Sequence, residues 1–397
     1  MIAYDYLSFK LTAVKVLILV PGPKNTLPSQ RFRVEHYLRN EDNKSIEFVL
    51  SSFYFLWAWK VLYKKGNAGL KVLGVLAGFL KRFFTLFTLF EYDYIYIHRE
   101  AASVGPPIFE WVIAKVWRKR IIYDFDDSIW VSASSASNPL ASYVKCNWKV
   151  KHICKWSHII TVGNDYLADY AGRYNNDVRV IPTVVDTENR HKFMKEIHEG
   201  VPTIGWTGTF TNFDQFELIK EAMQNLQERY DFKLQIIADK DPAFTDFKYE
   251  YKPWKEESEI TDLLQFDIGI MPLRDSAIQL GKCAFKAIQY MSLGIPSVVS
   301  PVGANCKVVL DGVNGLWANN SSEWIANLEN LLLNKELRAE LGRASRLRVV
   351  NRYSVAATEH SFFDMFKAPE QTFSFGTIFT APRFTYKPGN TFKEASA

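Results

Sequence analysis

Short apolar runs alternate with amphipathic stretches along most of the 397 residues. In the first half, runs rich in β-branched and aromatic residues predict strands at Val16–Val20, Ile46–Ser51, Tyr94–His98, Ile121–Asp124, Ile159–Val162 and Val178–Ile181. Strands that alternate with helical segments indicate a parallel sheet. After the polar segment Asp186–Gly200, the alternation starts again at Thr203–Trp206, Lys233–Ala238, Ile268–Met271 and Ser297–Ser300. The pattern therefore predicts two Rossmann-like halves joined by a linker.

Composition narrows the possible partners and the compartment. The net charge is only +5 and the basic residues are spread among acids, so nothing favours a nucleic-acid partner. The four cysteines, at positions 146, 154, 283 and 306, show no CxxC pair and no zinc spacing with histidine, which favours free thiols in a reducing cytoplasm and indicates no metal site. The apolar run Val14–Val20 ends in Pro-Gly-Pro rather than in a cleavage site, and we interpret it as the first strand.

The segment Gly281–Ser300 carries the clearest candidate chemistry. Its spacing predicts a helix that stops at Gly294 and a short strand at Ser297–Val299. Lys282 and Lys286 lie four residues apart, which would place them on one helical face. The N-terminus of a helix with two lysines suits a diphosphate, because the dipole and the ammonium charges act in the same direction. A solvated lysine face on an ordinary helix is the alternative.

A family resemblance rests on motifs in both halves. GKCAFKAIQYMSLGIPSVVS, DIGIMPL upstream and SPVGANCKVVLDGVNGLWA downstream resemble the C-terminal domain of retaining family-4 glycosyltransferases (glycosyl transferases group 1) of the GT-B fold. VKVLILVPGP, SQRFRVEHYL, YIYIHREA and IIYDFDDSIW resemble their N-terminal domain. The resemblance covers roughly residues 14 to 365.

The resemblance implies an α/β architecture with two Rossmann-like domains whose parallel sheets face a central cleft. We expect an acceptor-binding domain at 1–195 and a nucleotide-sugar-binding domain at 196–352. Periodicity predicts closing helices at Glu323–Leu333, Lys335–Leu347 and Ala356–Phe366. In the resembled fold the last helix, within 353–367, crosses back to the N-terminal domain. Residues 368–397 match nothing in the family and are predicted to form a flexible tail.

Donor-binding candidates come from the predicted C-terminal domain. In the turn Gly205–Phe213, Gly208 and Thr209 can bring backbone N–H groups close to a phosphate, although a plain strand-to-helix turn is the alternative. Lys286, and secondarily Lys282, would neutralise the departing diphosphate. The donor set also includes Arg274, which follows a predicted strand, Gly303, whose loop lies against the phosphates in relatives, and Gln289.

Two positions depart from the family pattern. Many relatives carry two glutamates here, the second of which contacts the donor ribose, whereas this chain has Gly281 and Gln289. Gln289 can still hydrogen-bond a ribose hydroxyl, but Gly281 has no side chain to offer. Because of these two differences, the resemblance does not define which donor sugar this chain binds or whether it is active.

Acceptor-side candidates cluster after predicted strands of the first domain. Asp124, Asp126 and Asp127 crowd one strand end, where carboxylates repel unless a cation or a proton offsets them. In relatives a histidine or aspartate lies under the sugar at this strand end, and Asp126 stands at the matching place. We therefore assign catalytic roles to Asp126, Asp127 and Lys286. Neighbouring strand ends add His98, Arg99, Arg31 and Arg33 to the acceptor side.

Each of these assignments has a structural alternative. The aspartates could form an Asx-rich helix cap. The histidine could be a packed or surface residue, and the arginines could be ordinary charges on a helix face.

Residues 53–90 raise the question of a membrane. They combine aromatics and leucines with Lys60, Lys64, Lys65, Lys71, Lys81 and Arg82. The uncharged stretch between Lys71 and Lys81 is only nine residues long, against the roughly 20 that span a bilayer, so we do not expect a transmembrane helix. Peripheral contact with an anionic membrane, on the inner face of the plasma membrane, and simple coverage of the sheet both remain open.

The leading hypothesis is a metal-independent, retaining transferase. It would move a hexose-type sugar from a UDP- or GDP-sugar to a hydroxyl of a glycan or lipid-linked acceptor, in cell-envelope polysaccharide biosynthesis, and the nucleotide sugar would be a co-substrate rather than a cofactor. A sugar-nucleotide epimerase of the same fold and a catalytically silent sugar-nucleotide-binding partner subunit are the alternatives. A nicotinamide oxidoreductase is disfavoured because no GxGxxG follows the first strand.

Overall fold

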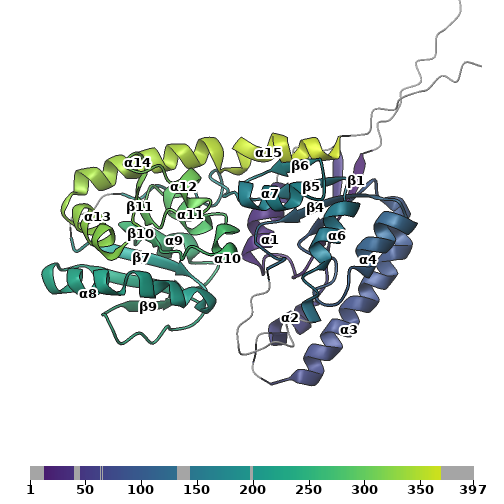
Figure 1. Cartoon of the computed structure of the whole chain (residues 1–397), viewed down its shortest axis with the longest axis horizontal. Helices are drawn as coiled ribbons and strands as arrows, with labels where there is room; N and C mark the ends of the chain where they lie inside the picture. Colours follow the sequence, from purple (N-terminus) through teal and green to yellow (C-terminus); the bar gives the residue numbers. More distant parts are fainter. Residues whose placement is uncertain are drawn as a thin grey trace, which may run out of the picture. The chain divides into compact units, whose positions relative to one another are not determined.

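The computed structural model describes residues 13–39, 45–62, 64, 66–131, 144–196 and 200–367. Two six-stranded parallel sheets organise these residues (Figure 1). The predicted tail at 368–397 and Lys65 lie outside the described residues.

The amino-terminal sheet has the order β2-β1-β3-β4-β5-β6. Its strands are β1 (Val14–Val20), β2 (Ile46–Ser52), β3 (Tyr94–His98), β4 (Arg120–Phe125), β5 (Ile159–Val162) and β6 (Val178–Val180). The centre of this sheet forms around β1, whose sequence is VKVLILV. Its β-branched and leucine residues fill both faces of the sheet, and Val16 to Val20 are all buried. All strands are parallel, so their carboxyl ends share one edge.

Helices and turns cover both faces of this sheet. They are α1 (Pro28–Gln30), η1 (Arg31–Glu35), η2 (Tyr37–Arg39), α2 (Leu56–Leu62), α3 (Ala68–Thr85), η3 (Leu86–Glu91), α4 (Ile108–Trp111), η4 (Val112–Val116), α6 (Lys149–Trp156) and α7 (Asp165–Gly172). One core joins α2, α4, α6 and α7 to the sheet, and another lies on the opposite face.

The carboxyl-terminal sheet has the order β12-β11-β10-β7-β8-β9. Its strands are β7 (Thr203–Gly208), β8 (Lys233–Ala238), β9 (Glu250–Pro253), β10 (Ile268–Met271), β11 (Ser297–Val299) and β12 (Gly315–Trp317). Around it lie η5 (Phe210–Leu218), α8 (Lys220–Arg229), α9 (Glu259–Leu263), α10 (Ala277–Leu280), α11 (Phe285–Ser292), α12 (Asn305–Val308), α13 (Ser321–Leu333) and α14 (Lys335–Arg352).

Helix α11 is bounded by two left-handed residues. Ala284 precedes it with φ 53°, and Gly294 follows it with φ 71°, which confirms the predicted helix stop. The predicted start is wrong, because the helix begins at Phe285, after Lys282. Lys282 and Lys286 therefore do not share a helical face, and the two lysines have different surroundings.

The segment after α14 returns to the amino-terminal sheet, as the fold class predicts. Helix α15 (Val355–Phe363) and turn η6 (Asp364–Phe366) place Phe362 and Phe366 in a core with strands β1 and β3. Phe362 stacks on Tyr37 with ring centroids 4.1 Å apart, and Tyr37 shares a hydrogen bond with Thr358 at 2.8 Å. These contacts join α15 to the amino-terminal sheet (Figure 1).

Candidate active site

Asp124, at the end of β4, is the centre of a fully buried polar cluster. Arg33, on η1 after β1, forms a salt bridge with it. The Nδ1–H of His98 donates to Asp124 Oδ2 at 2.7 Å, because a carboxylate oxygen only accepts, and the hydroxyl of Thr161 donates to Oδ1 at 2.6 Å. Burial alone would raise the pKa of Asp124, but Arg33 and His98 outweigh it and lower the pKa to about 2. Asp124 is thus ionised, and it binds the two neighbouring strands, β3 through His98 and β5 through Thr161.

Asp126 lies at the same edge but remains partly accessible. Its side chain is 11% exposed, and Arg99 donates to Asp126 Oδ1 from Nε at 3.0 Å and from Nη2 at 2.8 Å. Arg99 reaches this position in a left-handed conformation, with φ 63°, directly after β3. Burial would raise the pKa of Asp126, yet Arg99 and His98 bring it well below its usual range. Asp126 is therefore an anion with one face toward solvent.

Asp127 contacts the carboxyl-terminal half. Lys282 Nζ lies 3.1 Å from Asp127 Oδ2, and the Cys283 thiol donates to the backbone oxygen of Asp126 at 3.3 Å. Asn164, after β5, donates to the backbone oxygens of Leu280 at 3.2 Å and Lys282 at 3.0 Å. The strand ends of the amino-terminal sheet thus meet the segment that leads into α11.

Gly281 lies at the tightest point of this contact. A Cβ atom there would approach Ser128 Oγ to 2.1 Å and the Ser128 backbone nitrogen to 2.7 Å. Ser128 is held in place, since its hydroxyl donates to the Ala277 backbone oxygen at 2.9 Å. The glutamate of the family pattern cannot occupy position 281 unless this contact opens.

On the donor side, Lys286 lies in the first turn of α11 beside the end of β7. Its ammonium nitrogen is 5.3 Å from the centroid of a Trp206 ring, and a Cβ atom on Gly208 would approach Lys286 Cε to 2.9 Å. Burial, and then the charge of Lys282, lower the pKa of Lys286 to about 8. Among the described residues, this ammonium group makes no hydrogen bond or ion pair. The structure therefore brings the two donor candidates Lys286 and Gly208 together.

The other donor candidates, Thr209, Arg274 and Gly303, differ in their exposure and in their contacts. Thr209 is exposed, and its hydroxyl hydrogen-bonds Thr211 Oγ1 at 2.8 Å. Arg274 is exposed and donates to the backbone oxygen of Asp214 at 3.0 Å. Gly303 adopts φ 56°, and a Cβ atom there would lie 3.0 Å from the backbone oxygen of Leu280. Gly303 thus packs closely against the end of α10.

Gln289 belongs to a buried ion network that sequence reasoning missed. Its amide nitrogen donates to Glu259 Oε1 at 3.3 Å, and Arg31 Nη2 approaches the same oxygen at 3.2 Å. Arg190 Nη2 donates to Glu259 Oε2 at 2.5 Å, and Arg31 also pairs with Glu256 at 3.2 Å. Arg31 is therefore an inter-domain contact residue in this structure, 1% exposed. The acidic residues that follow Trp254 can be seen in the sequence, but their partners Arg31 and Arg190 are far away along the chain.

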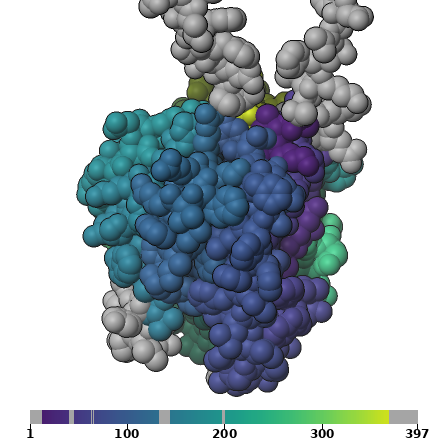
Figure 2. All heavy atoms as spheres, turned by 90° about the vertical axis from the view of Figure 1, so that its right-hand side faces the viewer, coloured from purple at the N-terminus to yellow at the C-terminus, as the bar shows by residue number. Residues whose placement is uncertain are grey.

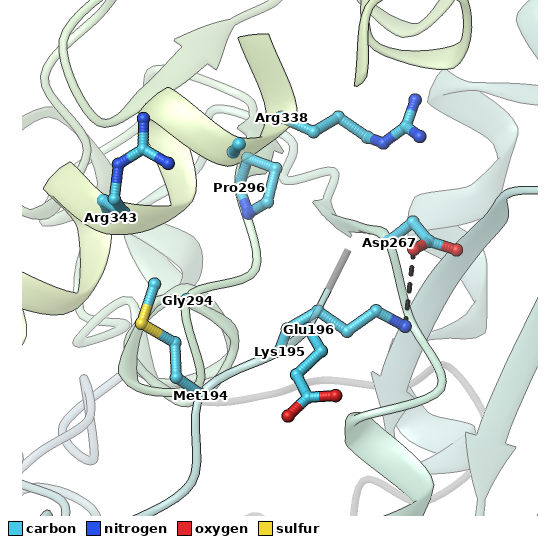
Figure 3. A pocket seen from close by; sticks show the side chains of 9 residues that line it. Met194, Lys195, Glu196, Asp267, Gly294, Pro296, Arg338 and Arg343 are labelled. Carbon is cyan, nitrogen blue, oxygen red and sulfur yellow. Dashed lines mark ion pairs between the residues drawn. The ribbon is translucent and has the colours of Figure 1, made fainter. Parts of the chain in front are cut away.

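Two further observations complete the geometry. Among the described residues, no group of three or more His, Cys, Asp and Glu side chains is placed to hold a metal ion. A hollow of about 300 Å³ lies at the other edge of the carboxyl-terminal sheet, where Asp267 precedes β10 and Pro296 precedes β11 (Figure 3). Lys195 pairs with Asp267 there at 3.3 Å. Ligands of open α/β sheets bind at the carboxyl ends of strands, so this hollow is not the candidate site.

Comparisons with known proteins agree with this architecture. Residues 201–334 match the family model described as glycosyl transferases group 1. Sucrose-phosphate synthase from Thermosynechococcus elongatus is similar, with a TM-score of 0.64 at 14% identity over 89% of this chain and 98% of that one. The comparison with curated proteins found no match.

Two further solved structures are similar to this chain, and each match also covers 89% of it. A glycosyltransferase from Rickettsia africae has a TM-score of 0.63 at 13% identity, covering 89% of this chain and 98% of that one. HepE from Anabaena, in complex with UDP and glucose, has a TM-score of 0.63 at 13% identity, covering 89% and 99%. The predicted fold class is confirmed, and the match of residues 201–334 agrees with the resemblance of the C-terminal domain to group 1 glycosyl transferases.

Proposed function

The chain has the GT-B fold and carries a group 1 glycosyl transferase domain at residues 201–334, and from this premise we propose that it is a retaining, metal-independent hexosyltransferase. Its donor is a nucleoside diphosphate sugar, UDP- or GDP-linked, and its acceptor is a hydroxyl of a glycan or lipid-linked molecule. The reaction belongs to cell-envelope polysaccharide biosynthesis on the cytoplasmic side of the membrane. The similarity to HepE, solved with UDP and glucose, supports a UDP-sugar donor.

The observation that carries this proposal is the environment of Lys286. Its half-buried ammonium lies next to Gly208 and at the N-terminus of α11, and among the described residues it has no recorded anionic partner. A cation held against an aromatic ring at the N-terminus of a helix is suited to an anion. A diphosphate provides the missing negative charge.

The chemistry follows from charge placement on the two sides of the site. As the bond between sugar and phosphate breaks, negative charge grows on the diphosphate, where Lys286 and the helix dipole stabilise it. Positive charge grows at the anomeric carbon, and the ionised Asp126 carboxylate is the group that we assign to stabilise it. The amide oxygen of Gln289 is the proposed acceptor for a ribose hydroxyl. None of these roles requires a side chain at Gly281.

Thermal unfolding against a panel of UDP-, GDP-, ADP- and CMP-sugars tests the donor site, because a ligand that binds only the folded state raises the Tm. We expect a shift with a UDP- or GDP-sugar that Lys286→Met abolishes. The matched control is Lys233→Met, which removes a lysine from the amino end of β8 in the same sheet and should leave the shift unchanged. No shift with any nucleotide sugar would contradict the proposal.

A silent sugar-nucleotide-binding subunit is the second candidate, because the Gly281 contact with Ser128 excludes a residue that many relatives have at this position. The two candidates differ in turnover. A purified chain that binds the donor tightly but releases no nucleoside diphosphate, with or without glycan and lipid-linked acceptors, would favour the silent subunit.

A further inference from the structure

One side of the amino-terminal domain exposes a continuous group of large apolar side chains, which we call the α3 face. It is formed by α2, α3 and η3 (Figure 2). Nearly half of the large hydrophobic residues that are exposed in the described chain belong to it: Phe55, Leu56, Trp57, Leu70, Val72, Leu73, Leu76, Leu80, Phe83, Phe84, Phe87 and Phe90. Soluble monomers rarely expose contiguous apolar patches of this extent, so the α3 face indicates an interaction site.

The helix under this face is long and apolar enough to cross a membrane, by its length and composition. Residues Ala68–Glu91 form 24 residues of helix with a mean hydropathy of 1.7 in an 18-residue window, of which 22% is buried. A core helix would be mostly buried, and this one is mostly exposed. Composition alone thus permits either a spanning or an in-plane helix.

The inner side of α3 decides between these two arrangements. A Cβ atom on Gly74 would lie 2.6 Å from Ala58, and one on Gly78 would lie 2.7 Å from the Phe53 ring, so α3 lies directly against the domain. Arg82 continues the same side and is 1% exposed. It donates to the backbone oxygens of Ala101 at 2.7 Å, Val20 at 3.1 Å and Ser51 at 2.9 Å. A spanning helix would have to give up these bonds and carry a guanidinium into lipid, which is costly.

Between Phe53 and Phe90 the charges of the α3 face have one sign, and the exposed Glu91 follows at the end of η3. No Asp or Glu occurs between Phe53 and Phe90, whereas Lys60, Lys64, Lys71 and Lys81 all lie in this segment. Lys60 and Lys64 are exposed, and Lys81 borders an apolar groove of about 500 Å³. A surface that combines apolar side chains with several lysines and a single carboxylate at one end is complementary to anionic phospholipid headgroups over acyl chains.

We propose that the α3 face docks in the plane of an anionic phospholipid membrane, with α3 lying in the headgroup layer and not crossing the bilayer. The hydrogen bonds of Arg82 also place this contact relative to the site. Val20 and Ser51 lie at the carboxyl ends of β1 and β2, the edge of the sheet where Asp126 follows β4. Resting on the proposed transferase function, the docked protein would therefore present its acceptor side close to lipid-linked hydroxyls.

Sedimentation of the full chain with vesicles tests the docking. We expect binding to vesicles that contain phosphatidylglycerol and weak binding to phosphatidylcholine alone. Lys60→Gln with Lys64→Gln should lower the partition coefficient on anionic vesicles by about 25-fold, since each lysine contributes about fivefold. Leu76→Gln with Phe84→Gln and Phe87→Gln should abolish binding. The matched control replaces equally exposed residues elsewhere, Val313, Leu333 and Leu347, by Gln and should bind like the wild type.

The in-plane orientation has its own measurement. Single Asn67→Cys and Glu91→Cys variants mark the two ends of the helix, and both residues are exposed. On the vesicle-bound fraction, a membrane-impermeant thiol reagent should label both positions, as read by peptide mass spectrometry. Protection of one end inside the vesicle would overturn the in-plane arrangement.

The outcomes also separate docking from the enzymatic proposal. Absence of vesicle binding by the wild type, or equal binding by the α3-face variant and the control, would overturn the docking. Self-association that the Leu76, Phe84 and Phe87 substitutions abolish, without vesicle binding, would instead identify a second copy of the chain as the occupant. The Tm shift with nucleotide sugars is measured without lipid, so its presence or absence reports on the donor site alone.

Discussion

The two sides of the candidate site differ in how their charges are balanced. On the amino-terminal side, Asp124, Asp126 and Asp127 each have a cation: Arg33, Arg99 and Lys282. On the carboxyl-terminal side, Lys286 has no recorded anionic partner among the described residues and its pKa is lowered toward neutrality. The acceptor side is therefore already organised without a ligand, whereas the donor side lacks a counter-charge that a diphosphate would bring.

The largest expected effect is on the free energy of unfolding. It comes from the amino-terminal side, where each aspartate is paired with a cation. Asp124→Asn should destabilise the fold by about 3–5 kcal/mol, because it leaves the buried Arg33 guanidinium without its counter-ion. Denaturant unfolding of wild type and variant at neutral pH measures the difference. A loss below about 1 kcal/mol would contradict the interpretation of Asp124 as an anchor.

The same variant has a pH signature with a defined sign. The folded pKa of Asp124 is about 2, below its ordinary value of 3.8, so its stabilising contribution is present above pH 3.8 and is lost as the pH falls toward 2. The stability difference between wild type and Asp124→Asn should therefore be constant at higher pH and narrow only in this acidic window.

Lys286→Met should have the largest effect on turnover. Removal of one preorganised charge from the leaving group is expected to lower kcat/KM by about 100- to 1,000-fold, or about 3–4 kcal/mol, with unchanged Tm in the absence of ligand. Steady-state release of the nucleoside diphosphate measures it. Wild-type rates in this variant would remove Lys286 from the mechanism.

Asp126→Asn should reduce transfer by about 100-fold and leave folding intact, which separates it from Asp124→Asn. The asparagine keeps an oxygen for Arg99 but loses the negative charge that we assign to the sugar. Because Asp126 is partly exposed, the substitution creates no deeply buried unpaired group. Comparison of donor affinity with kcat shows whether the loss is in turnover, as expected, or in binding.

Local patterning predicted much of the fold. Strands β3, β5, β8 and β10 have the predicted ends, because each is a compact apolar run with β-branched residues. Strands β9 and β12 were not predicted: EYKP is polar and GLW spans three residues, so neither carries an alternating signal. The family resemblance supplied the order of the domains, which periodicity does not contain.

The site was predicted less completely, for two physical reasons. Lys282 was assigned to the helix because spacing cannot show that Ala284 adopts a left-handed conformation, which is uncommon for a residue with a side chain. Arg31 was assigned to the acceptor, but it pairs with Glu259, 228 residues away, and no local pattern announces such a contact. The same holds for Gly281, whose neighbour Ser128 belongs to the other half of the chain.

The smallest expected effect is a pH dependence of donor affinity, which reports on Lys286 and therefore on the carboxyl-terminal side of the site alone. Below its pKa of about 8 Lys286 is charged, and above it the group is neutral, so donor affinity of the free protein should fall as the pH rises through about 8. The diphosphate of a UDP-sugar keeps its charge across this range, and a limiting slope of about tenfold per pH unit is expected for a single proton. Lys286→Arg is the matched control, because its guanidinium stays charged and should remove the slope while retaining affinity. If wild type and Lys286→Arg lost affinity in parallel, another group would be titrating. The contrast between a neutralised acceptor side and an unpaired donor lysine would then have no functional consequence.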